Sequence, residues 1–225
     1  MIHAEPFVDI HGERLMLLVE RAAYWERERT LLVADPHFGK AAAFRAAGVP
    51  VPRGTTTESL ARLDLALARV AARRIVFLGD FLHAREGRSP DTLRVITDWR
   101  ASHGNVEMLL VRGNHDRRAG DPPRELNITC LEGPVIELPF AFAHQPAASA
   151  KGYVVCGHIH PGVSLAGPAR ERTRLSCFWL GTAALVLPAF GEFTGLADIA
   201  ISRGDRVWVI ADGAVIEIDV SIREI

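Results

Sequence analysis

Four apolar runs in this chain have the length and composition of buried strands, and each one leads into a short polar motif. In chain order, the runs and motifs are residues 29–34 with Asp35-Pro36-His37, residues 74–78 with Gly79-Asp80, residues 106–111 with Gly113-Asn114-His115-Asp116, and residues 153–156 with Gly157-His158-Ile159-His160. Strands that alternate with helices build open sheets, which bind ligands at the carboxyl ends of their strands. The motifs therefore share one predicted location in the fold.

Two amphipathic helices are predicted between the first three of these strands. Thr55 and Glu58 have the spacing of a capping box, and leucines follow at helical spacing, which predicts a helix over roughly residues 56–72. Ser89-Pro90 is typical of a helix start and predicts a second helix that continues through Trp99. The N-terminal half therefore has the order of a sheet covered by helices.

The C-terminal part of the chain has a different pattern. After residue 175 strand-like runs follow one another, and Asp212-Gly213 is a hairpin signal between two of them. The sequence contains no internal repeat, low-complexity tract or linker, and a length of 225 residues suits one domain better than two. We therefore predict a second sheet that packs on the first, within a single domain over residues 1–225.

Composition and charge narrow the class of protein. Hydrophobic residues make up 48% and charged residues 24% of the chain, which is typical of a soluble globular protein. A net charge of -1 argues against nucleic-acid binding by bulk electrostatics, although bound dications would create a positive field of their own. The three cysteines suggest neither a disulfide framework nor a thiolate zinc site. Without a recognisable signal peptide or membrane span, the protein is expected in the cytoplasm and away from membranes.

The polar motifs and one further histidine supply carboxylate, imidazole and amide side chains. The candidate ligands are Asp35, His37, Asp80, Asn114, His115, Asp116, His144, His158 and His160. This mixture has too few oxygen atoms for calcium and no thiolate, so it points to manganese, iron or zinc. Each motif alone has a simpler explanation, such as a turn cap or a hydrogen-bonded core pair. Their joint occurrence after successive strands favours a metal site.

At these residues the sequence resembles the calcineurin-like metallophosphoesterase superfamily, whose signature is Asp-x-His, Gly-Asp, Gly-Asn-His-Asp, a single histidine and Gly-His-x-His. Four segments are also similar to the bacterial DNA-ligase-associated metallophosphoesterases: residues 34–40, 78–83, 157–161 and 187–195. This resemblance implies an α/β (α+β) fold, a four-layer αββα sandwich in which two mixed β-sheets are flanked by helices. It also implies two divalent metal ions, with manganese first and iron or zinc as alternatives.

The same resemblance implies a role for each site residue. The ligands divide into two sets with one shared member: Asp35, His37 and His160 for the first ion, Asn114, His144 and His158 for the second, and Asp80 for both. His115 would then protonate the leaving group, and Asp116 would orient the His115 imidazole. His83 would lie beside the substrate. Four basic residues are candidates for contact with a nucleic-acid backbone, with solvated surface charge as the simpler alternative: Lys40, Arg45, Arg117 and Arg118.

The resulting hypothesis is a manganese-dependent phosphodiesterase, a DNA endonuclease that acts on single strands in nucleic acid repair. The resemblance implies DNA as a partner and a functional association with a DNA ligase and a helicase of a repair cluster. The same metal core also suits a small-molecule phosphodiesterase or a phosphomonoesterase, because specificity depends on the surrounding loops. A non-enzymatic scaffold with this fold is the alternative from another class. The oligomeric state stays open, with a homodimer as one alternative.

Overall fold

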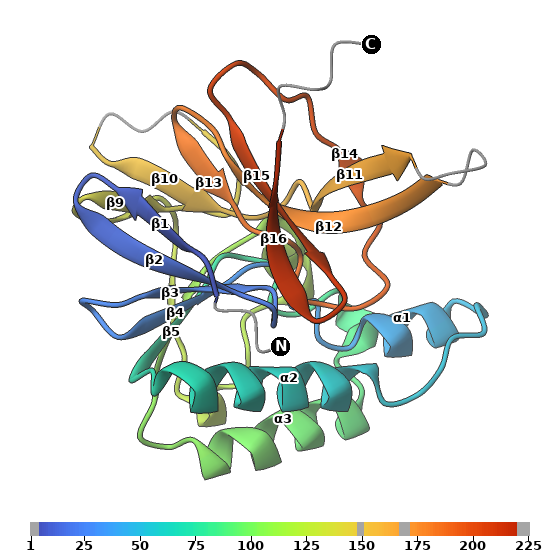
Figure 1. Cartoon of the computed structure of the whole chain (residues 1–225). Helices are drawn as coiled ribbons and strands as arrows, with labels where there is room; N and C mark the ends of the chain where they lie inside the picture. Colours follow the sequence, from blue (N-terminus) through green and yellow to red (C-terminus); the bar gives the residue numbers. More distant parts are fainter. Residues whose placement is uncertain (1–4, 148–150, 167–171, 220–225) are drawn as a thin grey trace.

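Seven strands between Phe7 and Leu131 form the first of two β-sheets in the structure, a computed structural model that describes residues 5–147, 151–166 and 172–219 (Figure 1). In spatial order the strands are β1 (Phe7–Ile10), β2 (Glu13–Leu18), β3 (Ala22–Trp25), β4 (Thr30–Val33), β5 (Arg74–Phe77), β6 (Glu107–Val111) and β7 (Thr129–Leu131). Strands β1 to β4 pair antiparallel, whereas β4 to β7 pair parallel. The sheet is therefore mixed, and its parallel half contains three of the four runs predicted as strands.

Nine strands form the second sheet, which is also mixed. Seven lie in the order β14 (Ala197–Asp198), β11 (Pro161–Ala166), β12 (Arg172–Leu180), β13 (Ala184–Val186), β10 (Tyr153–Cys156), β9 (Phe140–Phe142) and β8 (Val135–Glu137). The hairpin of β15 (Arg206–Ala211) and β16 (Ala214–Ile218) pairs with β12. Its turn has positive φ at both Asp212 and Gly213, as the Asp-Gly signal predicts.

The helices all belong to the chain segment between β4 and β7. The described α-helices are α1 (Lys40–Ala46), α2 (Thr55–Val70), α3 (Pro90–Ser102) and α4 (Asn114–Ala119), with 3-10 turns η1 (Arg85–Gly87) and η2 (Arg124–Leu126). Helices α2 and α3 lie on one side of the first sheet, and the second sheet lies on the other (Figure 1). Two mixed sheets with flanking helices confirm the expected metallophosphoesterase sandwich. A separate helical layer over the second sheet is absent from the described residues, because the chain after β7 consists of strands and loops.

Two layers of apolar side chains hold these elements together. Between the sheets, Trp25 packs edge-on against Phe140 with ring centroids 4.9 Å apart, and both side chains are buried. On the outer face of the first sheet, Leu63 of α2 and Ile96 of α3 are buried against the strands. The first sheet is therefore covered on both faces, which explains why its central strands read as continuous apolar runs.

Helix α2 begins differently from the prediction. Its N-cap is Gly54, at φ 96°, with no side-chain cap hydrogen bond, so the expected capping box of Thr55 and Glu58 is wrong. Helix α3 begins as expected, because Ser89 accepts a hydrogen bond of 3.2 Å from the Thr92 amide and Pro90 is the first helical residue. Within the described part of the chain, none of the helices combines the length and apolar character needed to cross a membrane.

Candidate metal centre

Three parallel strands of the first sheet deliver the first set of polar side chains. Asp35 follows β4, Asp80 follows β5 and Asn114 follows β6, so all three lie at the carboxyl edge of the sheet. Asp35 and Asp80 have φ angles of 51° and 52°, which turn the chain sharply after each strand. The His37 amide donates a hydrogen bond of 2.9 Å to the Asp80 carbonyl, which joins the first two loops.

The second sheet delivers the remaining histidines to the same place. His144 follows β9, and His158 and His160 follow β10, which pairs parallel with β9. The His158 amide donates a hydrogen bond of 2.7 Å to Oδ2 of Asp35. A Cβ atom on Gly157 would lie 2.3 Å from the same oxygen, so only glycine permits this approach of the two sheets. The candidate ligands therefore converge where the carboxyl edges of both sheets meet.

These side chains form two groups that could each hold a metal ion. One group is Asp35, His37 and His160, and the other is Asp80, His144 and His158; within each group the ligand atoms lie within 4.8 Å of one another. Asp80 faces both groups, because its Oδ2 lies 3.9 Å from Nε2 of His37 and its Oδ1 lies 3.5 Å from Nε2 of His144. Asn114 joins the second group, with its Oδ1 2.9 Å from Nε2 of His144.

The electrostatics of the groups fit bound cations. Oδ1 of Asp35 is buried without a hydrogen-bond partner among the described residues, and burial raises the pKa of this carboxyl well above its usual value. Nδ1 of His144 donates to the Leu78 carbonyl at 3.1 Å, so its Nε2 directs a lone pair at the Asn114 oxygen. Two facing acceptors repel each other unless a cation lies between them. Burial also lowers the pKa of His37 far below its usual value and that of His160 to about 4, so both rings are neutral donors.

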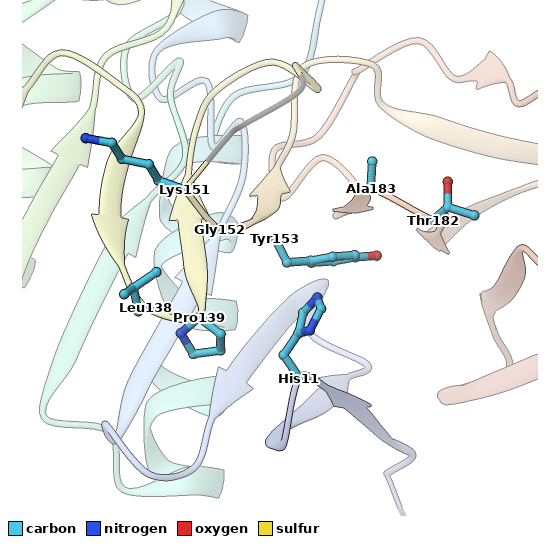
Figure 2. Close-up of a pocket in the computed structure, with 8 residues that line it drawn as sticks. All are labelled: His11, Leu138, Pro139, Lys151, Gly152, Tyr153, Thr182 and Ala183. Atoms are coloured by element: carbon cyan, nitrogen blue, oxygen red, sulfur yellow. The ribbon is translucent and has the colours of Figure 1, made fainter.

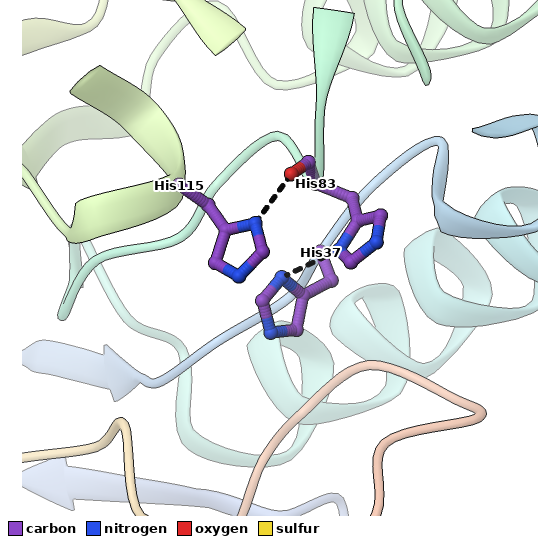
Figure 3. A group of neighbouring side chains, drawn as sticks. All are labelled: His37, His83 and His115. Carbon is purple, nitrogen blue, oxygen red and sulfur yellow. Dashed lines mark hydrogen bonds between the residues drawn. The ribbon is translucent and has the colours of Figure 1, made fainter. Parts of the chain in front are cut away.

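His115 and His83 lie next to the first group (Figure 3). Nδ1 of His115 donates a short hydrogen bond of 2.6 Å to the His83 carbonyl, and the two rings stack with centroids 4.8 Å apart. This leaves Nε2 of His115 free, 4.0 Å from Oδ2 of Asp80. Nδ1 of His83 lies 3.4 Å from Nδ1 of His37, and burial lowers the pKa of His83 to about 4. His37, His83 and His115 form a third group with metal-ligand spacing.

Asp116 has a different role from the expected one. Its carboxylate accepts hydrogen bonds of 2.9 Å from the amides of Gly113 and Phe81 and one of 3.4 Å from the Leu82 amide. The described hydrogen bonds of the His115 ring include none to the Asp116 carboxylate, because Nδ1 donates to the His83 carbonyl instead. The expectation that Asp116 orients the His115 imidazole is therefore corrected: Asp116 joins the loop after β5 to the loop after β6.

Comparison with protein-family models gives a match to the calcineurin-like phosphoesterases over residues 28–211. This chain belongs to the calcineurin-like phosphoesterase family. The donor groups described above are consistent with the dinuclear metal site typical of this family. The chain is therefore a metallophosphoesterase, as the motif order predicts.

Solved structures similar to this phosphoesterase include a nuclease. The crystal structure of Pseudomonas putida nuclease MPE is 42% identical, covers 95% of this chain and 100% of its own, and has a TM-score of 0.85. The phosphoesterase Yfce from E. coli is 16% identical, covers 84% of this chain and 97% of its own, and has a TM-score of 0.40. A comparison with curated protein sequences finds no match.

Sequence analysis missed the main-chain groups that orient the ligands of this phosphoesterase. The Leu78 carbonyl holds the His144 ring, and the His160 carbonyl accepts a hydrogen bond from the Ala197 amide. Gly79 has φ 86°, and a Cβ atom there would lie 2.1 Å from Nδ1 of His144. The glycine directly before Asp80 was the available signal in the sequence. Glycine is commonly found where the backbone has positive φ or where another group comes too close for a side chain.

Lys40 also lies closer to the centre than a surface charge would. It begins α1 directly after the Asp35 loop and is partly buried. Burial lowers its pKa, against the attraction of the Asp35 and Asp80 carboxylates. Lys40 therefore contributes positive charge next to the first group.

Figure 2 shows the residues that line a separate hollow of about 520 Å³. Its lining includes His11 of the β1–β2 turn and Tyr153, whose rings are 5.7 Å apart. Tyr153 begins β10 and His158 follows the end of that strand, so the hollow and the metal centre lie at opposite ends of β10. None of the expected site residues lines this hollow.

Proposed function

We propose that this phosphoesterase is a manganese-dependent phosphodiesterase that cleaves single-stranded DNA internally and acts in nucleic acid repair. The observation that carries the proposal is the pair of donor groups around Asp80, in a chain 42% identical to a nuclease. The donor groups account for phosphoester hydrolysis, and likeness to a nuclease supports a nucleic-acid substrate. Manganese, single strands and repair rest on the similarity of the motifs to the DNA-ligase-associated subgroup.

In this proposal seven side chains hold two divalent ions. They are Asp35, His37 and His160 for one ion, Asn114, His144 and His158 for the other, and Asp80 for both. Two Asp80 oxygens that face different groups support the shared role. Imidazole and carboxylate donors without thiolate support manganese, with iron or zinc as alternatives. When bound, the two ions would activate a water molecule and neutralise charge on the phosphate.

His115 would protonate the leaving alkoxide. Its Nδ1 hydrogen bond to the His83 carbonyl fixes the ring, and its free Nε2 lies 4.0 Å from the Asp80 carboxylate, beside the reacting phosphate in this proposal. General acids at such a position speed a reaction by about 10²–10⁴-fold. His83 would lie beside the substrate, because its ring stacks on His115 and contacts His37.

Digestion of circular single-stranded DNA with manganese tests this proposal directly. A circle has no end, so linear products require internal cleavage, and we expect them for single-stranded circles but not for duplex circles or RNA circles. The Asp80→Asn variant should cleave none of these substrates. Loss of linear single strands while circles persist would instead indicate an exonuclease, and cleavage of RNA would correct the substrate.

Paired chromogenic substrates separate the diesterase from the small-molecule and monoesterase alternatives. We expect hydrolysis of bis-p-nitrophenyl phosphate to exceed that of p-nitrophenyl phosphate. A preference for the monoester would support a phosphomonoesterase. Rapid hydrolysis of small diesters without DNA cleavage would support a small-molecule enzyme. The complete donor set and His115 argue against the scaffold alternative.

Further parts of the proposal concern the setting of the enzyme. We propose that residues 1–225 act as one domain, that the protein works in the cytoplasm, and that a DNA ligase and a helicase act in the same repair process. Support for these points comes from the sequence and the subgroup resemblance. Size-exclusion chromatography with light scattering would separate a monomer from a homodimer.

A further inference from the structure

The loop of residues 190–195, here called the 190–195 loop, is attached to the metal centre at its N-terminal end. The Phe190 amide donates to the Ala34 carbonyl at 2.8 Å, and the Gly191 amide donates to the Asp35 carbonyl at 3.1 Å. A Cβ atom on Gly191 would lie 2.4 Å from the Pro36 carbonyl oxygen, so this approach requires glycine. This end of the loop therefore has a fixed position against the Asp35–His37 segment.

Contacts with α2 and with His160 fix the rest of the loop. Arg62 of α2 donates to the Phe190 carbonyl at 2.6 Å and also bonds the Glu192 carboxylate. Further along the chain, β14 begins two residues after the loop, at Ala197. The Ala197 amide donates to the His160 carbonyl at 3.0 Å. The N-terminal end of the loop thus bonds the Asp35 segment, and the chain just after the loop bonds His160.

Phe193 lies in the middle of this fixed loop with an exposed side chain and a strained backbone. Its relative exposure is 47%, and its φ angle is 56°. Positive φ is an outlier for a bulky residue. Among the described residues it is the one Phe, Tyr or Trp with positive φ; five site residues, Asp35, His37, Asp80, His158 and His160, share this feature, as do six non-glycine residues elsewhere. Apolar burial does not explain Phe193, because nearly half of the residue stays in water. Strain of this kind clusters at functional sites.

We propose that Phe193 is a stacking platform for one nucleobase of the single-stranded DNA substrate, next to the phosphate that is cleaved. The inference rests on the proposed function. Phe193 is exposed and lies two positions after Gly191, whose amide bonds the Asp35 carbonyl, and an exposed aromatic ring offers a flat apolar surface that any base can cover. Lys40 begins α1 directly after the Asp35–His37 segment that the loop bonds, so a cation for the backbone accompanies an aromatic ring for the base. Single-strand binding sites commonly combine these two features.

Substitution of Phe193 tests the stacking role by kinetics and stability together. We expect Phe193→Ala to lower kcat/KM on single-stranded DNA about tenfold, as loss of one base–aromatic contact does, and Phe193→Trp to retain it. The Tm of Phe193→Ala should be unchanged, because the side chain is half exposed, and that of Phe193→Gly should be unchanged or higher, because glycine adopts positive φ without a Cβ penalty. Ile216→Ala is the matched control, since Ile216 is 45% exposed on β16, and it should leave kcat/KM unchanged.

Substrates with a single abasic position identify the base that stacks. With the parent enzyme, removal of one base near the cleavage site should lower kcat/KM, and with Phe193→Ala the same removal should have no further effect. Equal kcat/KM of the parent and Phe193→Ala on intact strands, or a lower Tm that accounts for the loss, would overturn the stacking role while leaving the nuclease intact. If the parent cleaves no DNA at all, the proposed function fails and the stacking role fails with it.

Discussion

Asp35 has an unusual environment for a charged residue. It is fully buried, one carboxylate oxygen has no hydrogen-bond partner among the described residues, and the Asp80 carboxylate lies nearby. Burial of an unpaired charge destabilises a fold unless a cation or a proton compensates it. Asp35 should therefore lower the stability of the metal-free protein. In the metal-bound protein the same carboxylate should raise stability, because it would bind the cation.

We expect Asp35→Asn to change stability in opposite directions without and with metal. Burial raises the folded-state pKa of Asp35, so the metal-free fold binds this proton more tightly than the unfolded chain and loses stability as pH rises through the raised pKa. Removing the charge should stabilise the chelated protein at neutral pH by about 1–3 kcal/mol, and less at acid pH. In excess manganese the variant should be less stable than the parent. Urea titrations at two pH values, without and with manganese, measure these changes in the free energy of unfolding. A change of the same sign in both conditions would contradict the metal site.

His115 should affect the chemistry more than metal binding. We expect His115→Ala to bind the same number of manganese ions but to cleave DNA about 10²–10⁴-fold more slowly, because the leaving alkoxide lacks a proton donor. Hydrolysis of bis-p-nitrophenyl phosphate, whose leaving group needs no proton, should fall much less. His11→Ala removes an exposed histidine outside the centre and serves as the control. Equal losses on both substrates would argue against the acid role.

The loop backbones between the strands and the ligands determine where the ligand side chains lie. Gly79 has φ 86° and lies against the His144 ring, while Gly12 in the β1–β2 turn has φ 83° and open space where a Cβ atom would lie, with nothing within 4 Å. Both glycines therefore have a backbone conformation that disfavours other residues, and only at Gly79 would a side chain also clash with a neighbour. Alanine substitutions at Gly79 and Gly12 can therefore distinguish the effect of backbone strain from the effect of displacing a metal ligand.

We expect Gly79→Ala to lose one of the two bound ions, because the added methyl group would displace His144 from the second donor group. Gly12→Ala should bear a similar strain in the turn but keep both ions. Metal content after gel filtration, measured by mass spectrometry, gives the stoichiometry of each variant. Two ions in Gly79→Ala would show that the loop can shift without losing His144.

Asp116 connects two loops, and its removal should therefore affect folding before chemistry. We expect Asp116→Ala to lower the free energy of unfolding by about 2–4 kcal/mol, because buried amides of Gly113 and Phe81 lose their acceptor. Denaturant unfolding of the chelated protein measures this loss without interference from metal. A variant of full stability with low activity would instead support a role for Asp116 in orienting His115.

The two sheets of the molecule meet at the metal centre. Asp35, His37, Asp80 and Asn114 come from the first sheet, and His144, His158 and His160 come from the second. Each donor group contains side chains from both sheets. A bound ion would therefore link the two halves of the sandwich, in addition to the apolar layer between them.

Removal of metal should accordingly lower the stability of the whole sandwich. At a free manganese concentration about 100 times Kd, each ion should add about 2.7 kcal/mol to the free energy of unfolding. Thermal unfolding of chelated protein, titrated with manganese, should show a Tm that rises and follows the metal concentration. Asp80→Asn, which weakens both groups, should show a smaller rise. A Tm that does not respond to manganese would contradict a centre shared by both sheets.

Local patterns in the chain were sufficient for the four strands that lead into the polar motifs and for the C-terminal hairpin, whereas β9, which precedes His144, was not predicted. Residues 153–156 were predicted as a strand and form β10, and the Asp212-Gly213 turn lies where its hairpin signal predicts. Strand periodicity and turn preferences act between near neighbours, so a sequence can reveal them. The motif order was likewise enough to indicate the phosphoesterase family.

Contacts between distant segments required the three-dimensional structure. The Asp35–His158 hydrogen bond joins residues 123 positions apart, and Asp116 bonds the Phe81 amide 35 positions away instead of the adjacent His115 ring. The strained, exposed conformation of Phe193 likewise depends on how the 190–195 loop packs on the Asp35 loop. Ligand types follow from residue identity, but the atom that each side chain faces depends on how two sheets pack, and no short-range pattern encodes that packing.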